Sequence, residues 1–312
     1  MTSELAREII ASLPTGRTLF PYHRDRYALQ LLRAAFPGGE SVVNIKRSRF
    51  HGLLHKPAVR TLIAKLGRNH ITPKDLESGW PHNHQTYRLT LGQWPEPDER
   101  WDRDYHQTTR RGTNLVLRLN FAVSHNRELN RITRTDIADY NDCSIHPIEK
   151  RQNLTLAWSR IDLDFDTREA LIEEIQTDWI RDARRWARGS RHGEHAARFR
   201  KYRDTIMKPH LPIWDEAMLS ATLWFLIEEI GIRSIFYHTA KSGSRFKRID
   251  CSHPPRSVYT DLPRRFCFQS TCNGPLFIRD RSDRRVRRLF QRPETKWFHL
   301  AFPAACNLAL AV

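Results

Sequence analysis

The chain has 312 residues and a formal net charge of +17, with 39% hydrophobic residues. Its length and apolar content allow a sizeable core, and the absence of a run of about 18 apolar residues argues against a membrane-spanning helix. The excess of Arg and Lys favours a polyanion, such as nucleic acid or a phosphorylated ligand, as the partner.

Cysteine usage and the first residues favour a cytoplasmic protein. The five cysteines are scattered and odd in number, which argues against a disulfide framework. The opening residues include acids and no long apolar stretch, unlike a secretion signal. Cys267 and Cys272 have no second pair of matching spacing, so a closed zinc site is not expected.

Residues 1–95 are predicted to form a helical N-terminal region. Apolar residues recur at helical spacing in 3–13, 23–36 and 56–67, and "TPKDLES" (72–78) starts a fourth, short helix. Pro57 fits the first turn of the third helix, and Gly67 fits its end. Before the boundary at residue 95, "TYRLTLGQW" (86–94) alternates like a strand.

Residues 96–312 are predicted to form an α+β domain. Apolar alternation predicts further strands over 113–123, 154–166 and 169–178, the last two joined as a hairpin. An Arg-rich helical segment (181–204), a long buried helix (214–231) and a buried strand (232–239) follow. The remainder is rich in Pro and Arg with little periodicity, and the apolar C-terminal end is expected to be buried. The predicted fold is a helical N-terminal region followed by an antiparallel or mixed sheet with a long buried helix.

The predicted hairpin carries a group of carboxylates. Alternate residues share a face of a strand, so Asp162 and Asp164 point the same way, and so do Glu174 and Gln176 on the partner strand. We expect Asp164 to lie opposite Glu174 and the two to bind Mg²⁺ or Mn²⁺, with Gln176 positioning a water. The alternative is that Arg side chains simply pair with these acids.

This pattern resembles restriction-endonuclease-like nucleases, in which an acid on one strand precedes Glu-x-Lys on the next. The matching residues are Asp164 (or Asp162), Glu174 and Gln176. The resemblance implies metal-dependent cleavage of phosphodiesters. Gln176 stands where Lys is usual, and it lacks the positive charge that would activate water.

Basic residues near the hairpin are candidate phosphate contacts. The Arg-rich segment and the small, basic "KSGSRF" stretch (241–246) both fit this role. The predicted nucleic-acid-binding residues are Arg181, Arg184, Arg185, Arg188, Lys241 and Arg245. His238, at a strand end, is a candidate catalytic base or phosphate ligand, with a structural hydrogen-bonding role as the alternative.

The stretch "EIQTDW" (174–179) also resembles a module of large polyvalent proteins from phages and mobile elements, which carries "EIQSDW". There a long helix and a strand follow, as in 214–239 here, and Thr177 replaces Ser. The similarity covers about 154–246, and over a longer span the chain is similar to a bacterial protein family of unknown function. These resemblances imply a site around 176–179 and a link to phage or mobile-element conflict, but no reaction.

The order strand, helix, strand, with Thr239 after the second strand, is similar to the acetyl-coenzyme A half of GNAT acyltransferases. That resemblance implies a pantetheine along the strand and a pyrophosphate at a helix N-terminus. The glycines of "RWARGSRHGEH" have the wrong spacing for the turn of that family. A metal-dependent nuclease-like protein is therefore the leading hypothesis, a non-catalytic nucleic-acid-binding or interaction module the second, and an acyltransferase the third.

Overall fold

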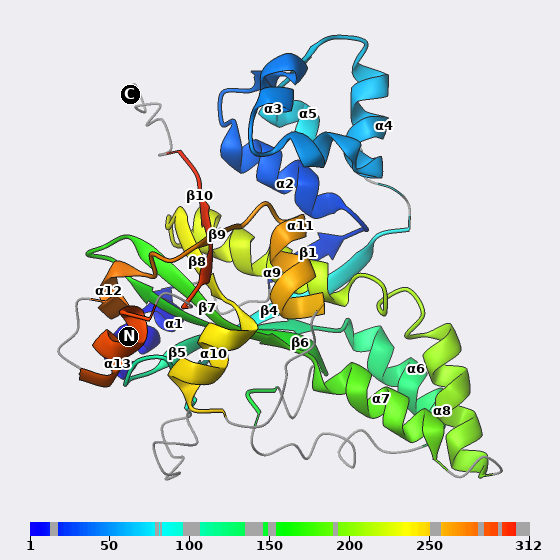
Figure 1. Cartoon of the computed structure of the whole chain (residues 1–312). Coiled ribbons are helices and arrows are strands. Elements are labelled where there is room, and N and C mark those ends of the chain that lie inside the picture. Colours follow the sequence, from blue (N-terminus) through cyan, green and yellow to red (C-terminus); the bar gives the residue numbers. More distant parts are fainter. Residues whose placement is uncertain are drawn as a thin grey trace.

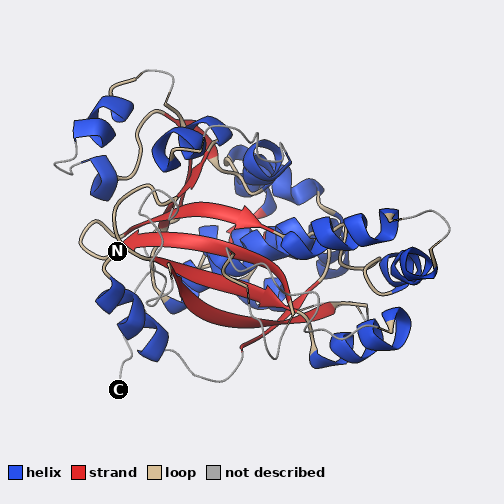
Figure 2. Cartoon of the chain, turned by 90° about the horizontal axis from the view of Figure 1, so that it is seen from below, coloured by secondary structure: helices blue, strands red, loops and turns tan. Residues whose placement is uncertain are grey.

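An eight-stranded mixed sheet forms the centre of the molecule (Figure 1). The structure is a computed structural model that describes residues 1–12, 18–78, 81, 83–95, 107–134, 146–148, 154–189, 193–249, 257–279, 284–292 and 295–303. The strand order is β1-β4-β5-β6-β7-β8-β10-β9, and helices lie along both sides of the sheet (Figure 2). The predicted α+β class is confirmed.

All neighbouring strands of this sheet are antiparallel except β7 and β8, which are parallel. The strands, in sheet order, are β1 (Thr18–Tyr22), β4 (Gln85–Trp94), β5 (Asn114–Asn120), β6 (Thr155–Asp164), β7 (Glu169–Gln176), β8 (Ser234–His238), β10 (Trp297–Ala301) and β9 (Gln269–Thr271). Two short strands, β2 (Glu40–Ser41) and β3 (His70–Ile71), pair separately. The predicted strands in the middle of the chain are therefore confirmed.

The first 95 residues contain the predicted helices. They are α1 (Ser3–Ser12), α2 (Arg26–Ala35), α3 (Val42–Arg47), the 3-10 helix η1 (His51–His55), α4 (Pro57–Leu66) and α5 (Pro73–Glu77). Gly67 ends α4 in the left-handed conformation (φ 62°), and Thr72 and Asp75 form a capping box at α5. However, β1 and β4 also lie in this region and β4 pairs with β5, so the sheet crosses the predicted boundary at residue 95.

A largely buried helix spans the middle of the sheet. It comprises α9 (Trp214–Trp224), which contacts β5, β6 and β7, and a π-helical turn, η4 (Phe225–Glu229). This confirms the predicted buried helix. The Arg-rich segment forms two helices that pack on each other, α7 (Asp178–Arg188) and α8 (Glu194–Thr205). Two further helices are α6 (Val123–Thr133), which packs on α8, and α10 (Ala240–Lys247), which follows β8.

The C-terminal segment is more regular than its sequence predicts. It forms the π-helical turn η5 (Ser257–Asp261), α11 (Leu262–Arg265), α12 (Leu276–Arg279), α13 (Arg284–Phe290) and strands β9 and β10. Leu300 of β10 is fully buried, while the apolar stretch 304–312 lies outside the described residues. None of the described helices has the length and apolar character that a bilayer crossing requires.

Candidate functional site

The register of the acidic hairpin differs from the prediction. Asp164 lies opposite Glu169, and Glu174 lies opposite Arg160. Asp164 lies four positions after Arg160 on β6, which places the two acids about 13 Å apart along the strands. The expected pairing of Asp164 with Glu174 is therefore wrong. The reason is a short turn over 165–168, in which the Asp164 carboxylate accepts hydrogen bonds from the backbone and hydroxyl of Thr167.

Cationic groups already pair with two other carboxylates of the hairpin, Glu174 and Asp162. Glu174 forms ion pairs with Arg160 and with Lys247, whose Nζ lies 3.5 Å from Glu174 Oε2. Burial alone would raise the pKa of Glu174, but the charges of Lys247 and Arg160 outweigh it and lower that pKa. Asp162 is fully buried between Arg110 and the α-amino group of Met1.

The donor set therefore does not fit the predicted Mg²⁺ or Mn²⁺ site. Asp164 and Glu174 are too far apart to share one ion, and the oxygens of Glu174 bind cationic side chains. Within the described ranges, no group of three or more His, Cys, Asp or Glu residues could hold a metal ion. Cys267 and Cys272 are free thiols.

A fully buried polar network encloses His238. Its Nε2 lies 2.7 Å from Thr109 Oγ1, and its Nδ1 lies 3.0 Å from Ser242 Oγ. The Thr109 hydroxyl in turn donates to the buried Glu173 carboxylate (2.7 Å). Burial lowers the pKa of His238, so the ring is held neutral. This geometry matches the structural alternative for His238, because its ring nitrogens bond to protein groups and its fully buried side chain does not line the cavity described below.

Strands β7 and β8 diverge after four paired residues. Their pairing runs from Glu169 with Ser234 to Ile172 with Tyr237, whereas β7 continues to Gln176. A bulge at Glu173 accompanies the divergence, since Arg160 pairs with Glu174 and Ile161 pairs with Ile172. Within the part of the chain that the structure describes, the last residues of β7 thus pair with β6 on one side and with no strand on the other.

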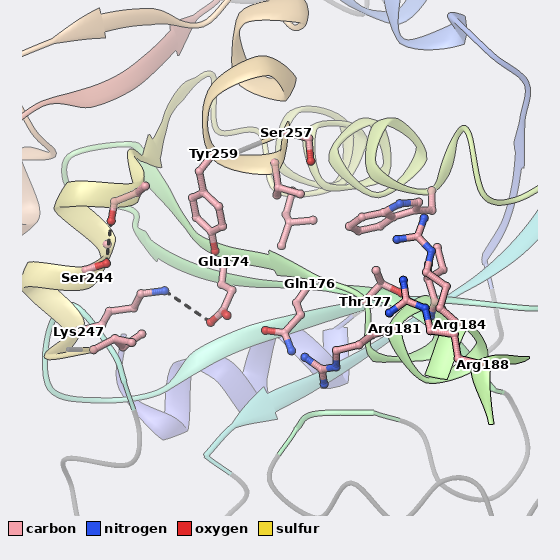
Figure 3. Close-up of a pocket in the computed structure, with 17 residues that line it drawn as sticks. Glu174, Gln176, Thr177, Arg181, Arg184, Arg188, Ser244, Lys247, Ser257 and Tyr259 are labelled. Carbon is pink, nitrogen blue, oxygen red and sulfur yellow. Dashed lines mark hydrogen bonds and ion pairs between the residues drawn. The ribbon is translucent and has the colours of Figure 1, made fainter. Parts of the chain in front are cut away.

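A cavity of about 610 Å³ occupies the wedge where the two strands diverge (Figure 3). Its walls come from the end of β7, α7, α10, Trp214 at the start of α9, and the turn η5. The polar and aromatic lining residues are Glu174, Gln176, Thr177, Arg181, Arg184, Arg188, Trp214, Ser244, Lys247, Ser257 and Tyr259. We call this cavity the wedge pocket.

One face of α7 lines the wedge pocket with guanidinium groups. Arg181, Arg184 and Arg188 follow one another at a spacing of three and four residues, so they share that face. Figure 3 shows them at one end of the pocket, with Glu174 and Lys247 at the other. Arg181 also pairs with Asp178 in the first turn of α7 (2.5 Å). Arg185 does not line the pocket, and it pairs with Asp182 (3.3 Å).

The "EIQTDW" stretch joins β7 to α7. Thr177 is the N-cap of α7, and its hydroxyl accepts a hydrogen bond from the backbone N–H of Ile180. Asp178, in the first turn, accepts hydrogen bonds from the Gln176 amide (2.9 Å) and the Trp158 indole (3.1 Å). These contacts fix the direction in which α7 leaves the sheet, and so the direction of its arginine face.

The wedge pocket brings together half of the predicted site residues. Those that line it are Glu174, Gln176, Arg181, Arg184 and Arg188. Those that do not are Asp164, Arg185, His238, Lys241 and Arg245.

Sequence reasoning missed Lys247, Trp214 and Tyr259. The available signal for Lys247 was its position on α10, one helical turn after Gly243, since both residues face the pocket. Trp214 begins the predicted buried helix (214–231), but its side chain is only partly buried and reaches the pocket.

Comparison of the sequence with models of known protein families finds no match, and comparisons with curated proteins and with solved structures find no significant match. The resemblances to nucleases, to mobile-element modules and to acyltransferases thus stay predictions. The geometry of the wedge pocket supplies the basis for choosing among them.

Proposed function

We propose that the wedge pocket binds a coenzyme A thioester and that the protein is an acyltransferase. The observation that supports this proposal is the continuity of two surfaces inside one cavity. A strand edge without a neighbour runs directly into a helix whose facing side carries three arginines. Of the three hypotheses drawn from the sequence, only the acyltransferase needs an open strand edge followed directly by a phosphate-binding helix.

The open edge of β7 suits an extended ligand that contains amides. Backbone N–H and C=O groups that lack a strand neighbour require other hydrogen-bond partners. The Glu173 carbonyl faces α10, because Lys247 Nζ donates to it (3.1 Å). Backbone groups alternate in direction along a strand, so those of Ile175 are expected to face the same side. A pantetheine arm, with two amides in an extended chain, can add to this edge as a further strand would.

The arginine face of α7 suits the phosphates of the same ligand. Guanidinium groups bind phosphate oxygens through paired hydrogen bonds. The Asp178 carboxylate occupies the first turn of α7, so the helix N-terminus itself is less favourable for an anion than the GNAT resemblance implies. We therefore assign the phosphates to Arg181, Arg184 and Arg188. The Trp214 side chain provides a flat apolar surface beside them for a nucleobase.

Acyl transfer from the thioester requires little of the protein beyond orienting the two substrates and transferring a proton. An acceptor amine attacks the thioester carbonyl and forms a carbon–nitrogen bond while the carbon–sulfur bond breaks, and the leaving thiolate takes up the proton that the amine releases. In Figure 3 the ring of Tyr259 points toward Glu174. Burial raises the pKa of Tyr259, so its hydroxyl keeps its proton and can donate a hydrogen bond to developing negative charge.

Calorimetric titration with coenzyme A and acetyl-coenzyme A tests the proposal. We expect Arg184→Gln combined with Arg188→Gln to weaken binding by about tenfold or more, because each change removes a charge-assisted hydrogen bond. Arg185→Gln is the matched control on the same helix and is expected to leave the affinity unchanged. Release of free thiol from acetyl-coenzyme A, with spermidine or a lysine peptide as acceptor, then tests transfer.

Two results would refute this assignment. One is the absence of coenzyme A binding by a folded wild-type protein. The other is an equal loss of affinity in Arg185→Gln and in the wedge-pocket variant, because binding would then depend on net charge rather than on the pocket.

The metal-dependent nuclease is not our proposal, because the hairpin register separates its two expected metal ligands. A nucleic-acid partner stays a prediction from the net charge of +17. Electrophoretic shift of labelled DNA and RNA at low and high salt checks it, since such binding weakens steeply with salt.

A further inference from the structure

A second cavity, of about 360 Å³, lies between the N-terminal helices and the C-terminal segment. One wall comes from the end of the α3–η1 region and the other from α11 and the start of β9. Its charged lining residues are Arg49, Lys56, Arg264 and Arg265, and no Asp or Glu lines it. His51 and Phe268 also line it. We call it the basic pocket, and it shares no lining residue with the wedge pocket.

Three of the four cations lack a carboxylate partner among the described residues. Arg265 is the exception, because its guanidinium binds Asp215 (2.6 Å) beside the pocket. Arg49 donates a hydrogen bond to the neutral backbone carbonyl of Ala301 and lies over the Phe50 ring. Lys56 lies over the ring of Tyr27, 5.7 Å from its centroid. These contacts position the side chains without cancelling their charge.

Holding these cations together is unfavourable in the empty pocket. Like charges repel, and partial burial removes part of the hydration of Arg49, which lowers the pKa of its guanidinium. A bound anion would offset both effects at once. The pocket is large enough for a phosphate or a pyrophosphate, and the Phe268 and Leu53 side chains form an apolar wall.

We propose that the basic pocket binds a phosphate group, held by Arg49, Lys56 and Arg264. The phosphate comes either from a small phosphorylated compound or from the backbone of a nucleic acid. Arg264 is exposed at the surface and Arg49 lies deeper, so the ligand enters past Arg264. This site is independent of the acyltransferase proposal and stands whether or not coenzyme A binds to the wedge pocket.

Two probes distinguish the two sources of phosphate. Pyrophosphate binding is measured by calorimetry, and binding of a fluorescein-labelled single-stranded oligonucleotide by anisotropy, both at low salt. We expect Lys56→Gln and Arg264→Gln each to weaken binding of the preferred probe by about tenfold, through loss of one charge-assisted contact. Arg264 is exposed, so its replacement is not expected to affect folding, and thermal melting checks this for both variants.

Two control variants assign the binding to this pocket. Arg60→Gln removes a positive charge from α4, one turn after Lys56, at an exposed position outside the pocket. Arg47→Gln removes one from α3, also at an exposed position outside the pocket. Each is expected to change the affinity by no more than about twofold, as is usual for an uninvolved surface charge. Arg184→Gln, in the wedge pocket, detects any part of the signal that comes from that cavity.

The binding results distinguish a small phosphorylated ligand from a nucleic acid, and both from failure of the proposal. Pyrophosphate binding that depends on Lys56 and Arg264 supports a small phosphorylated ligand. Binding of the oligonucleotide alone, with the same dependence, supports a nucleic acid. The proposal is overturned if neither probe binds, if Arg60→Gln is as damaging as the pocket variants, or if binding depends on Arg184 and not on Lys56.

Discussion

A buried histidine, His125, and a partly buried one, His210, should make the fold sensitive to acid. His125 of α6 stacks on Phe121 with ring centroids 3.7 Å apart, and its Nε2 lies 2.8 Å from the Tyr202 hydroxyl. His210, in the turn before α9, lies 2.9 Å from the Tyr87 hydroxyl through its Nδ1. The two imidazole centroids are 6.3 Å apart. Both rings therefore belong to a buried aromatic cluster that joins the sheet to α6 and α8.

Burial lowers the pKa of both histidines. Burial together with the nearby His210 lowers the pKa of His125 from 6.5 to about 3, and burial lowers that of His210 to about 4. In the unfolded chain both residues take up protons below pH 6.5, whereas in the fold they stay neutral. Stability is therefore fully present above pH 6.5 and is lost as the pH falls toward the folded values. From pH 6.5 to about pH 4.5 each residue should remove about 2–3 kcal/mol from the free energy of unfolding.

The titration of Glu216 changes the stability in the opposite direction with pH, so the contribution of a histidine has to be isolated by comparing a His variant with the wild type. Burial raises the pKa of Glu216 to about 7, and this group stabilises the fold at low pH and loses that effect as the pH rises through 7. We therefore replace His125 by Gln, which does not titrate. Urea denaturation followed by Trp fluorescence, at a series of pH values, gives the free energy of unfolding for each protein.

Between pH 6.5 and about pH 4.5, His125→Gln should lose about 2–3 kcal/mol less than the wild type. His55→Gln, at an exposed position of η1, is the control and should follow the wild-type curve. Parallel curves for the wild type and His125→Gln would refute the reasoning, because His125 would then titrate alike in the folded and unfolded states.

Three further predictions concern stability, each measured by urea denaturation at pH 7. Glu174→Ala should cost about 3–5 kcal/mol, because it leaves the buried Arg160 and Lys247 without their shared carboxylate; a loss below about 1 kcal/mol would contradict the ion-pair assignment. Thr177→Ala should cost about 1 kcal/mol, since it removes the N-cap of α7, and Thr177→Ser should restore most of that stability. Leu219→Ala should cost about 3–5 kcal/mol, because this fully buried side chain of α9 leaves a cavity in the core; a cost near zero would mean that α9 repacks.

The local parts of the fold were predictable from the sequence. The alternation of Leu115, Leu117 and Leu119 identifies β5, and the apolar surface of 214–231 identifies the buried helix. Strand β1 escaped prediction because it is short and contains Pro21, a residue that strands accept mainly at sheet edges, which is where β1 lies. The C-terminal strands escaped because β9 and β10 gain their partners from distant pairing, not from their own pattern.

In the candidate site, too, features set by neighbouring residues could be predicted, and contacts between distant residues could not. The spacing of Arg181, Arg184 and Arg188 on one helix is local, and the structure places all three in the wedge pocket. The partner of Glu174 depends on the length of the hairpin turn and on Lys247, which lies 73 residues away in sequence (247 − 174). A one-position change in register alters every facing pair, so alternation alone could not identify that partner.

The chain between residues 257 and 269 contributes to both cavities. Ser257, Val258 and Tyr259 line the wedge pocket, and Arg264, Arg265 and the residues from Cys267 to Gln269 line the basic pocket. A ligand that displaces this whole segment from one cavity would also change the lining of the other. Occupancy of the two cavities would then be thermodynamically linked, and each ligand would change the affinity of the other by the same factor.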